Sequence, residues 1–307
     1  MNNIIDVKNL SVLFGGFKAV NDISFDVKKG EIFGFLGANG AGKTTTIRVL
    51  CGILKPSSGK VFLEGKDVTK SIQILKNEIG YMSQKSTLYK DLTIAENIIF
   101  SGRLYNMDDE KIEKRRKELF DFIDLKENIS KTAGSLPLGI KQMVALCATV
   151  LHDPEIIFLD EPTAGVDPKT RERFWELIKN MASLGKTIFV TTHYMDEAAY
   201  CNRIVLMDKG SIIDFDSPDN LKNKYFKQKP VEIKFKDAQV QNKIMKEFEN
   251  QNAGYGYIFA DTLRFFVNDK TGFENIILEY KKDLTVTQTE ATLEDVFLKA
   301  LQRENKK

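Results

Sequence analysis

The chain has few of the residues that build disulfide frameworks and zinc sites. Its 307 residues include only three cysteines and two histidines. Cys51, Cys147 and Cys201 lie far apart with no paired spacing. This pattern argues against a disulfide framework and against a Cys/His metal site, and it is typical of a reducing compartment.

The sequence also lacks long apolar segments and a strong charge of either sign. No apolar run approaches the about 20 residues of a membrane-spanning helix. The first residues show no basic region followed by an apolar run, so no signal peptide is expected. Lys and Arg number 45 and Asp and Glu 43, a balance that argues against binding nucleic acid by bulk charge. Its length predicts about two domains at roughly 100–200 residues each.

Strand and helix patterns alternate along most of the chain. The first 35 residues indicate short strands, and about residues 92–151 are mostly helical in pattern. Three apolar, β-branched runs predict buried strands: Ile156–Leu159, Thr187–Thr191 and Arg203–Met207. Helical patterns lie between these runs, over Pro168–Leu184 and Met195–Tyr200. This alternation predicts an α/β fold with a parallel sheet.

A domain boundary is expected in the segment Ser217–Pro230, which is rich in Lys, Asn and Pro. The segment after it reads as strand, helix, hairpin, helix, strand and closing helix, which predicts a small α+β domain. We therefore expect one domain over residues 1–225 and an accessory domain over residues 226–307. The aromatic residues of the accessory domain are interpreted as one sheet's core, because no basic groove accompanies them as in a base-stacking surface: Tyr255, Tyr257, Phe259, Phe265 and Phe266.

A glycine-rich loop carries the strongest chemical signal. The sequence from Gly37 to Thr44, GANGAGKT, fits G-x-x-x-x-G-K-[ST], follows the apolar run EIFGFL and opens a helical run. Glycines let the backbone curl so that its N–H groups surround phosphate oxygens, and the helix N-terminus adds its dipole. Lys43 supplies a charge to the β- and γ-phosphates, and the Thr44 hydroxyl can ligate Mg²⁺. The loop predicts a nucleoside triphosphate site.

Two acids follow an apolar strand later in the chain. Asp160 and Glu161 end the run IIFLDE, which places carboxylates at the edge of a parallel sheet where ligands bind. We expect Asp160 to hold Mg²⁺ and Glu161 to polarise an attacking water. An apolar strand with an acidic end is common, and the interpretation gains its force from the glycine-rich loop in the same chain.

Over about residues 4–225 the sequence resembles the ATP-binding subunits of ABC transporters. The motifs stand in the order of that family: the loop, Gln84 in GYMSQ, LPLGIKQ at Leu136–Gln142, the acidic pair, AGVD at Ala164–Asp167, and His193 after a strand. The resemblance implies a P-loop cassette with a parallel sheet core, an antiparallel β subdomain and a helical subdomain at about residues 85–151. It implies ATP and Mg²⁺ as cofactors.

The resemblance also implies roles for individual residues. Glu161, His193, Lys43 and Gln84 would be catalytic, and Thr44, Gln84 and Asp160 would hold the metal. Positions implied to contact nucleotide are Phe14, Gly37, Asn39, Gly40, Ala41, Gly42, Lys43, Thr44, Thr45, Pro137, Gly139 and Asp167. Phe14 matches the aromatic residue that stacks on adenine, although an apolar strand residue would look the same. His152 has no such context and is expected to be structural.

One motif departs from the family. The usual signature is Leu-Ser-Gly-Gly-Gln, whereas this chain has Leu-Pro-Leu-Gly-Ile, with Pro137 in place of the serine. Proline suits the first turn of a helix, so the N–H groups of Leu138, Gly139 and Ile140 can still face an anion. The missing hydroxyl hydrogen bond to a charged group is worth roughly 1.5–3 kcal/mol. A catalytically dead site is the alternative interpretation.

The variant signature and the final helix, ATLEDVFL, resemble the drug-resistance, daunorubicin-type branch of type-2 ABC exporters. This resemblance implies an ATPase that forms a dimer, pairs with a separate transmembrane permease, and lies in the cytoplasm on the inner face of the cell membrane. Two alternatives stay open: an ABC-type ATPase acting on ribosomes or DNA, and a regulatory subunit that binds ATP without turnover. Near-neutral charge argues against a nucleic-acid partner.

Overall fold

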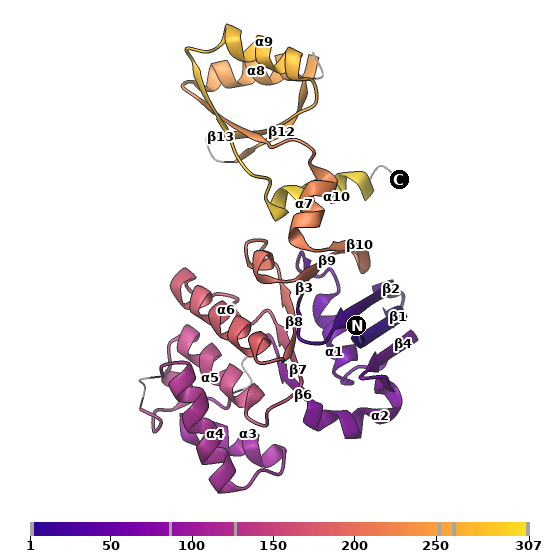
Figure 1. Cartoon of the computed structure of the whole chain (residues 1–307), viewed down its shortest axis with the longest axis vertical. Coiled ribbons are helices and arrows are strands. Elements are labelled where there is room, and N and C mark those ends of the chain that lie inside the picture. The colour runs from indigo at the N-terminus through magenta and orange to yellow at the C-terminus, as the bar shows by residue number, and fades with distance from the viewer. Residues whose placement is uncertain (1–2, 86–87, 126–127, 251–252, 260–261, 305–307) are drawn as a thin grey trace. The chain divides into compact units, whose positions relative to one another are not determined.

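The computed structural model describes residues 3–85, 88–125, 128–250, 253–259 and 262–304. The chain forms two compact units, which meet in sequence between Pro218 and Asp219 (Figure 1). Helix α7 (Pro218–Tyr225) lies in the segment where the domain boundary is expected, so part of that segment is regular structure.

The centre of the first unit is a six-stranded sheet. Its strand order is β10-β9-β3-β8-β7-β6. The strands are β3 (Ile32–Gly37), β6 (Ile79–Met82), β7 (Ile156–Asp160), β8 (Thr187–Thr192), β9 (Arg203–Asp208) and β10 (Ser211–Asp216). All neighbours pair in parallel except β10, which is antiparallel to β9. The predicted parallel sheet is confirmed, and every residue of β3, β7 and β8 is buried, which explains their continuous apolar runs.

A second, antiparallel sheet packs on the first. Its order is β2-β1-β4-β5, with β1 (Asn3–Phe14), β2 (Phe17–Lys28), β4 (Ser58–Leu63) and β5 (Lys66–Asp67). Val7 and Phe25 of this sheet belong to the same hydrophobic core as Phe33 and Phe189 of the central sheet. The helices α1 (Lys43–Leu50) and α2 (Val68–Leu75), with the 3-10 turn η1 (Lys76–Glu78), complete this part of the unit.

Three helices form the region predicted at about residues 85–151. They are α3 (Ile94–Leu104), α4 (Asp109–Phe122) and α5 (Leu138–Val150), with a 3-10 turn η2 (Ala133–Ser135) before α5. Thr93 and Glu96 make a reciprocal capping box at the start of α3. The long helix α6 (Pro168–Ser183) agrees with its prediction. The helix expected over Met195–Tyr200 is only a 3-10 turn, η3 (Glu197–Tyr200).

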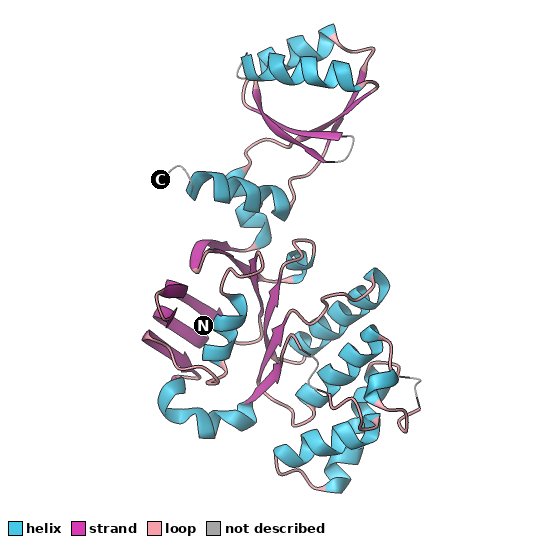
Figure 2. Ribbon diagram, turned by 180° about the vertical axis from the view of Figure 1, so that it is seen from behind, coloured by secondary structure: helices cyan, strands magenta, loops and turns pink. Residues whose placement is uncertain are grey.

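The second unit has a four-stranded antiparallel sheet of order β12-β13-β11-β14. Its elements are β11 (Val231–Phe235), α8 (Ala238–Asn250), β12 (Gly254–Phe259), β13 (Thr262–Val267), α9 (Lys270–Glu279), β14 (Leu284–Gln288) and α10 (Leu293–Glu304). The chain order β-α-β-β-α-β with this strand order is the split βαβ arrangement. Helices α8 and α9 lie on the same face of the sheet in both views (Figures 1 and 2).

The aromatic residues of this unit divide between the two faces of its sheet. Phe265 packs with Phe248 and Phe273 in the core under α8 and α9. The neighbouring Phe266 stacks on Tyr255, and strand alternation places it on the opposite face. The expectation of a single aromatic core is therefore wrong in detail, because alternate residues of one strand point to opposite faces. The side chain of Phe259 and the turn of the predicted hairpin lie outside the described residues.

Candidate active site

The glycine-rich loop joins β3 to α1 and has a backbone that requires glycine at two points. Gly42 has a φ of 108°, and a Cβ there would lie 2.4 Å from the carbonyl oxygen of Ala19. A Cβ on Gly37 would lie 2.3 Å from the carbonyl oxygen of Met207. The loop therefore curls tightly against β2 and β9, and the first turn of α1 opens directly from it.

The ammonium group of Lys43 lies at the centre of this loop. It donates to the carbonyl oxygens of Gly37 at 2.8 Å and Ala38 at 3.2 Å. It also lies 3.1 Å from Oε1 of Glu161, and both side chains are buried. The ammonium group is thus held between the glycine-rich loop and the carboxylate of Glu161.

Asp160 is the second acid at this edge of the sheet. Its Oδ1 accepts hydrogen bonds from Thr44 at 3.0 Å and Thr191 at 2.7 Å. Its Oδ2 is buried and has no hydrogen-bond partner among the described residues. Burial is the main cause that raises the pKa of Asp160, and the charge of Glu161 adds to it, while the two hydroxyl hydrogen bonds act in the opposite direction.

Glu161 follows β7 and has a strained backbone, and three side chains approach its carboxylate. Its φ of 48° lies in the left-handed region, and its N–H points to the carbonyl and hydroxyl oxygens of Thr191 at 3.1 and 3.0 Å. Oε2 accepts from Nε2 of Gln84 at 2.9 Å and lies 3.3 Å from Nδ1 of His193. Lys43 approaches the other carboxylate oxygen, Oε1. The structure therefore brings together all four residues that the family resemblance implied to be catalytic.

A cleft of about 360 Å³ opens above these groups. Its lining comprises Phe14, Phe17, Ala19, Asn39, Gly40, Gly42, Lys43, Thr44, Thr45, Gln84 and Glu161. Phe14 and Phe17 pair across the hairpin of β1 and β2, and their side chains are 52% and 64% exposed. Of these two rings, only Phe14 is predicted from the sequence motifs. The hairpin register, with Gly15 and Gly16 at the turn, is the signal that pairs the second ring with it.

Two predicted positions in the loop, Gly37 and Ala41, do not line the cleft. Gly37 lies against β9, and Ala41 is buried with its carbonyl oxygen accepting from the N–H of Gly210. Both residues pack on the side of the loop away from the cleft lining, and neighbouring loop residues line the cleft.

The remaining predicted positions lie at the start of two helices, away from the cleft of their own chain. Pro137 is the N-cap of α5 and precedes its first turn, which begins at Leu138. A Cβ on Gly139 would lie 2.6 Å from Cγ2 of Thr170, so α5 approaches α6 closely there. Asp167 caps α6 by accepting from the N–H of Thr170 at 3.0 Å, and this hydrogen bonding lowers the pKa of Asp167.

His152, which is expected to be structural, contacts none of these predicted site residues. Its ring stacks on Tyr105 with centroids 3.5 Å apart, and Nε2 lies 3.1 Å from the carbonyl oxygen of Ile79. Burial lowers the pKa of His152 to about 4. These contacts explain the residue without a ligand.

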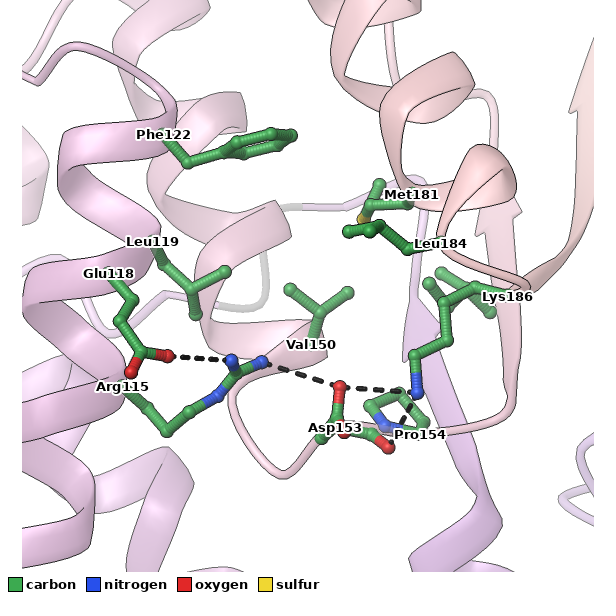
Figure 3. A pocket seen from close by; sticks show the side chains of 11 residues that line it. Arg115, Glu118, Leu119, Phe122, Val150, Asp153, Pro154, Met181, Leu184 and Lys186 are labelled. Carbon is green, nitrogen blue, oxygen red and sulfur yellow. Dashed lines mark hydrogen bonds and ion pairs between the residues drawn. The ribbon is translucent and has the colours of Figure 1, made fainter.

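A second cavity, of about 200 Å³, lies between the ends of α4, α5 and α6. Leu119, Val150 and Met181 are among its apolar walls (Figure 3). Along one side Arg115 and Lys186 both approach the carboxylate of Asp153, at 3.5 and 3.2 Å. These charges are paired with each other, and the cavity holds none of the motif residues.

The described residues contain no group of three or more His, Cys, Asp or Glu side chains that could hold a metal ion. Thr44 and the unpaired Oδ2 of Asp160 nevertheless offer the oxygen ligands that Mg²⁺ takes when phosphate and water complete its shell. Within the described part of the chain, no helix combines the length and the apolar character needed to cross a membrane.

Known proteins resemble this chain in sequence. The family described as ABC transporter matches residues 20–164. The probable multidrug ABC transporter ATP-binding protein YbhF of Escherichia coli K12 is 44% identical over 219 residues, which are 71% of this chain and 38% of that protein. The chain thus spans less than half the length of that relative. A Nod factor export ATP-binding protein I of Burkholderia lata is 33% identical over 301 residues, 98% of this chain and 97% of the relative.

Solved structures agree with the first unit. CbiO1 from Clostridium perfringens, part of the ABC transporter complex cbiONQ, has a TM-score of 0.66 and 29% identity over 72% of this chain and 91% of its own. The dimeric structure of the bacterial ABC transporter cassette MJ0796 has a TM-score of 0.65 and 26% identity over 69% of this chain and 98% of its own. The fold prediction is thereby confirmed. Because the Burkholderia relative matches along nearly its whole length, the chain belongs to the ATP-binding subunits of ABC transporters.

Proposed function

We propose that this chain hydrolyses ATP to drive an exporter whose membrane-spanning part is a separate permease. The observation that carries the proposal is the carboxylate of Glu161, which Lys43, Gln84 and His193 approach at 2.9–3.3 Å at the base of the nucleotide cleft. A carboxylate fixed beside the phosphate-binding lysine is placed to accept a proton from an attacking water. His193 and Gln84 orient it from the opposite side.

The cleft divides into a base end and a phosphate end. The exposed rings of Phe14 and Phe17 offer an apolar platform to adenine. The backbone N–H groups of the glycine-rich loop and the start of α1 would hold the phosphates, with Lys43 as the cation. Thr44, Asp160 and Gln84 would hold Mg²⁺, which neutralises phosphate charge when bound.

The active assembly in this proposal is a dimer. Pro137, Gly139 and Asp167 lie at helix starts outside the cleft of their own chain, so they can meet nucleotide only on a second cassette. The N–H groups of Leu138, Gly139 and Ile140 lie in the first turn of α5, where an anion is favoured. A homodimer supplies two such helix starts and two clefts by symmetry.

The helical region offers a surface for the permease. Tyr89, Phe100 and Leu104 are exposed around a groove of about 170 Å³ on α3 and its surroundings. Contiguous exposed apolar residues mark interaction sites on soluble domains. In this proposal the chain is held on the cytoplasmic face of the cell membrane through that groove, and the second unit, residues 219–304 as described, is an accessory domain.

The names of the relatives support an export role, since one describes a multidrug ABC transporter and the other describes Nod factor export. The Leu136–Ile140 signature and the closing helix α10 favour the drug-resistance, daunorubicin-type branch. A regulatory subunit without turnover is the second candidate, and Pro137 favours it because proline cannot supply a hydroxyl to phosphate. The intact set around Glu161 favours hydrolysis.

Glu161→Gln tests the proposal in the full chain reconstituted with its permease. The amide keeps the size of the side chain but cannot accept a proton, so ATP turnover should fall by about 10²–10⁴-fold while ATP binding persists. The bound nucleotide should then hold the dimer closed, which size-exclusion chromatography with and without ATP detects. Glu176→Gln on the exposed face of α6 is the matched control. Parental turnover in Glu161→Gln would contradict the assignment of the base.

A further inference from the structure

A buried acid that none of the motifs includes lies beside the catalytic pair. Glu197 begins η3 and is only 1% exposed. Its Oε1 accepts a hydrogen bond from the hydroxyl of Thr163 at 2.6 Å, and its Oε2 accepts one from the hydroxyl of Thr192 at 2.5 Å. Burying a carboxylate costs free energy unless its oxygens accept hydrogen bonds. In Glu197 both oxygens do, so these bonds replace the water that burial excludes.

The two threonines stand next to the residues of the proposed chemistry. Thr163 follows Glu161 by two positions, and Thr192 immediately precedes His193. The hydroxyl oxygen of Thr192 also accepts the N–H of Tyr194 at 3.0 Å, so the backbone on both sides of His193 is fixed through it. Glu197 therefore ties the segment after β7 to the segment after β8.

The charge of Glu197 is balanced from a third element. Nε of Arg171, on α6, lies 3.6 Å from its Oε1, and the guanidinium lies 4.0 Å from the centre of the Tyr194 ring. Tyr194 in turn lies against the ring of His193, with centroids 4.1 Å apart. Arg171 and Tyr194 thus form a chain of contacts from Glu197 to the ring of His193.

We propose that Glu197 is a positioning residue for ATP hydrolysis. By holding Thr163 and Thr192 it fixes the separation between Oε2 of Glu161 and Nδ1 of His193, which is 3.3 Å. The inference rests on the proposed function of Glu161 and His193. Glu197 does not line the nucleotide cleft, so it acts on turnover and leaves nucleotide binding to the loop.

The test compares variants of the full chain by steady-state ATPase kinetics. Thr192→Val removes the hydroxyl with little change of shape, and Thr192→Ser keeps it. We expect Thr192→Val and Glu197→Ala to lower kcat by about 10- to 100-fold, the effect of a small misplacement of reacting groups, with KM for ATP within about twofold of the parent. Thr192→Ser should keep kcat within about twofold to threefold, because the tie to Glu197 persists.

A matched control separates this tie from a general loss of charge near α6. Asp196 precedes Glu197, its side chain is 73% exposed, and it also approaches Arg171, at 3.6 Å. Asp196→Ala should leave kcat unchanged. The double variant Glu197→Ala/Thr192→Val should cost at most about twofold more than Glu197→Ala alone, because both changes break the same interaction.

Thermal unfolding and binding of a fluorescent ATP analogue complete the test. Equal kcat in Thr192→Val and the parent, equal losses in Thr192→Ser and Thr192→Val, or additive losses in the double variant would each overturn the inference. A loss of ATP affinity as large as the loss of kcat would also overturn it. If the parental chain with its permease hydrolyses no ATP, the proposed function fails; if it hydrolyses ATP and Glu197→Ala matches it, only this inference fails.

Discussion

The amide nitrogen of Gln84 lies 2.9 Å from Oε2 of Glu161, although 77 residues separate the two in sequence. Gln84 follows β6 at the edge of the central sheet, and Glu161 follows its neighbour β7. Helix α3 begins ten positions after Gln84 in sequence, so this hydrogen bond joins the proposed base to a residue shortly before the helical region that we propose meets the permease. If the helical region meets the permease as proposed, Gln84 is placed to link that surface to the nucleotide chemistry.

Gln84→Ala should lower turnover more than nucleotide affinity. The substitution leaves the phosphate loop intact but removes one of the side chains that orient Glu161, so we expect kcat to fall by about tenfold or more. Binding of a fluorescent ATP analogue should change by less than threefold. Gln142, buried in α5 and outside the cleft, offers a comparison: the effect of Gln142→Ala should appear in thermal stability instead. A change of affinity alone in Gln84→Ala would contradict this expectation.

Two glycines give a matched pair for the phosphate loop. Gly42→Ala introduces a Cβ 2.4 Å from a backbone oxygen at a φ of 108°, so the loop must deform and ATP binding should be lost. At Gly16 a Cβ meets nothing within 4 Å and φ is not positive. Gly16→Ala should therefore fold and bind ATP like the parent. Isothermal titration with ATP compares the two, and ATP binding by Gly42→Ala with parental affinity would contradict the loop geometry.

The paired rings at the mouth of the cleft predict a shared effect on the base. Phe14→Ala and Phe17→Ala should each weaken ATP binding, and the stacking of one base on one ring is worth roughly 1–3 kcal/mol. Thermal stability should change little because both rings are more than half exposed. Phe122→Ala, on α4 and outside this cleft, is the control. If inorganic triphosphate loses affinity as much as ATP does, the rings act on the loop and not on the base.

The sequence predicted those features of the site that short contiguous motifs encode, and it missed those that depend on contacts between separate segments. The glycine-rich loop and the pair Asp160-Glu161 are contiguous motifs after apolar strands, and parallel strands bring their carboxyl ends to one edge. Phe17 escaped because its pairing with Phe14 depends on hairpin register. Glu197 was not predicted because its role depends on Thr163, 34 positions away in the segment after β7, together with Thr192 at the end of β8.

Two other segments form regular structure that the sequence patterns did not predict. Helix α7 lies in a segment whose Lys, Asn and Pro content is typical of a linker, yet Pro218 occupies its first position, where proline is tolerated. The short strand β10 pairs only with β9, and half-buried positions throughout give it no clear alternation. In both places tertiary packing decided a segment whose local signal was weak.

Pro137→Ser should strengthen dimer closure without changing the isolated cleft. Pro137 is the N-cap of α5 and has no side-chain capping bond. A serine there can accept from a backbone N–H, which stabilises a helix by about 1 kcal/mol, and it presents a hydroxyl to an anion. ATP affinity of the monomer should be unchanged, while ATP-dependent dimerisation, measured by light scattering, should occur at lower ATP. A large loss of monomer affinity would show that this helix start belongs to the chain's own cleft.

His152 makes part of the stability depend on pH. Burial lowers the pKa of His152 to about 4 from the ordinary value of 6.5, so the folded chain favours the neutral ring. Its contribution is full above pH 6.5 and is lost as the pH falls through about 4, because the unfolded chain then binds the proton more readily. The shift corresponds to about 3 kcal/mol. Carboxylates titrate in the same range, but they do so equally in His152→Asn. The free energy of unfolding, measured by urea at pH 7.0 and 4.5, should therefore fall more steeply in the parent than in this variant, and parallel losses would show that the ring is not held neutral.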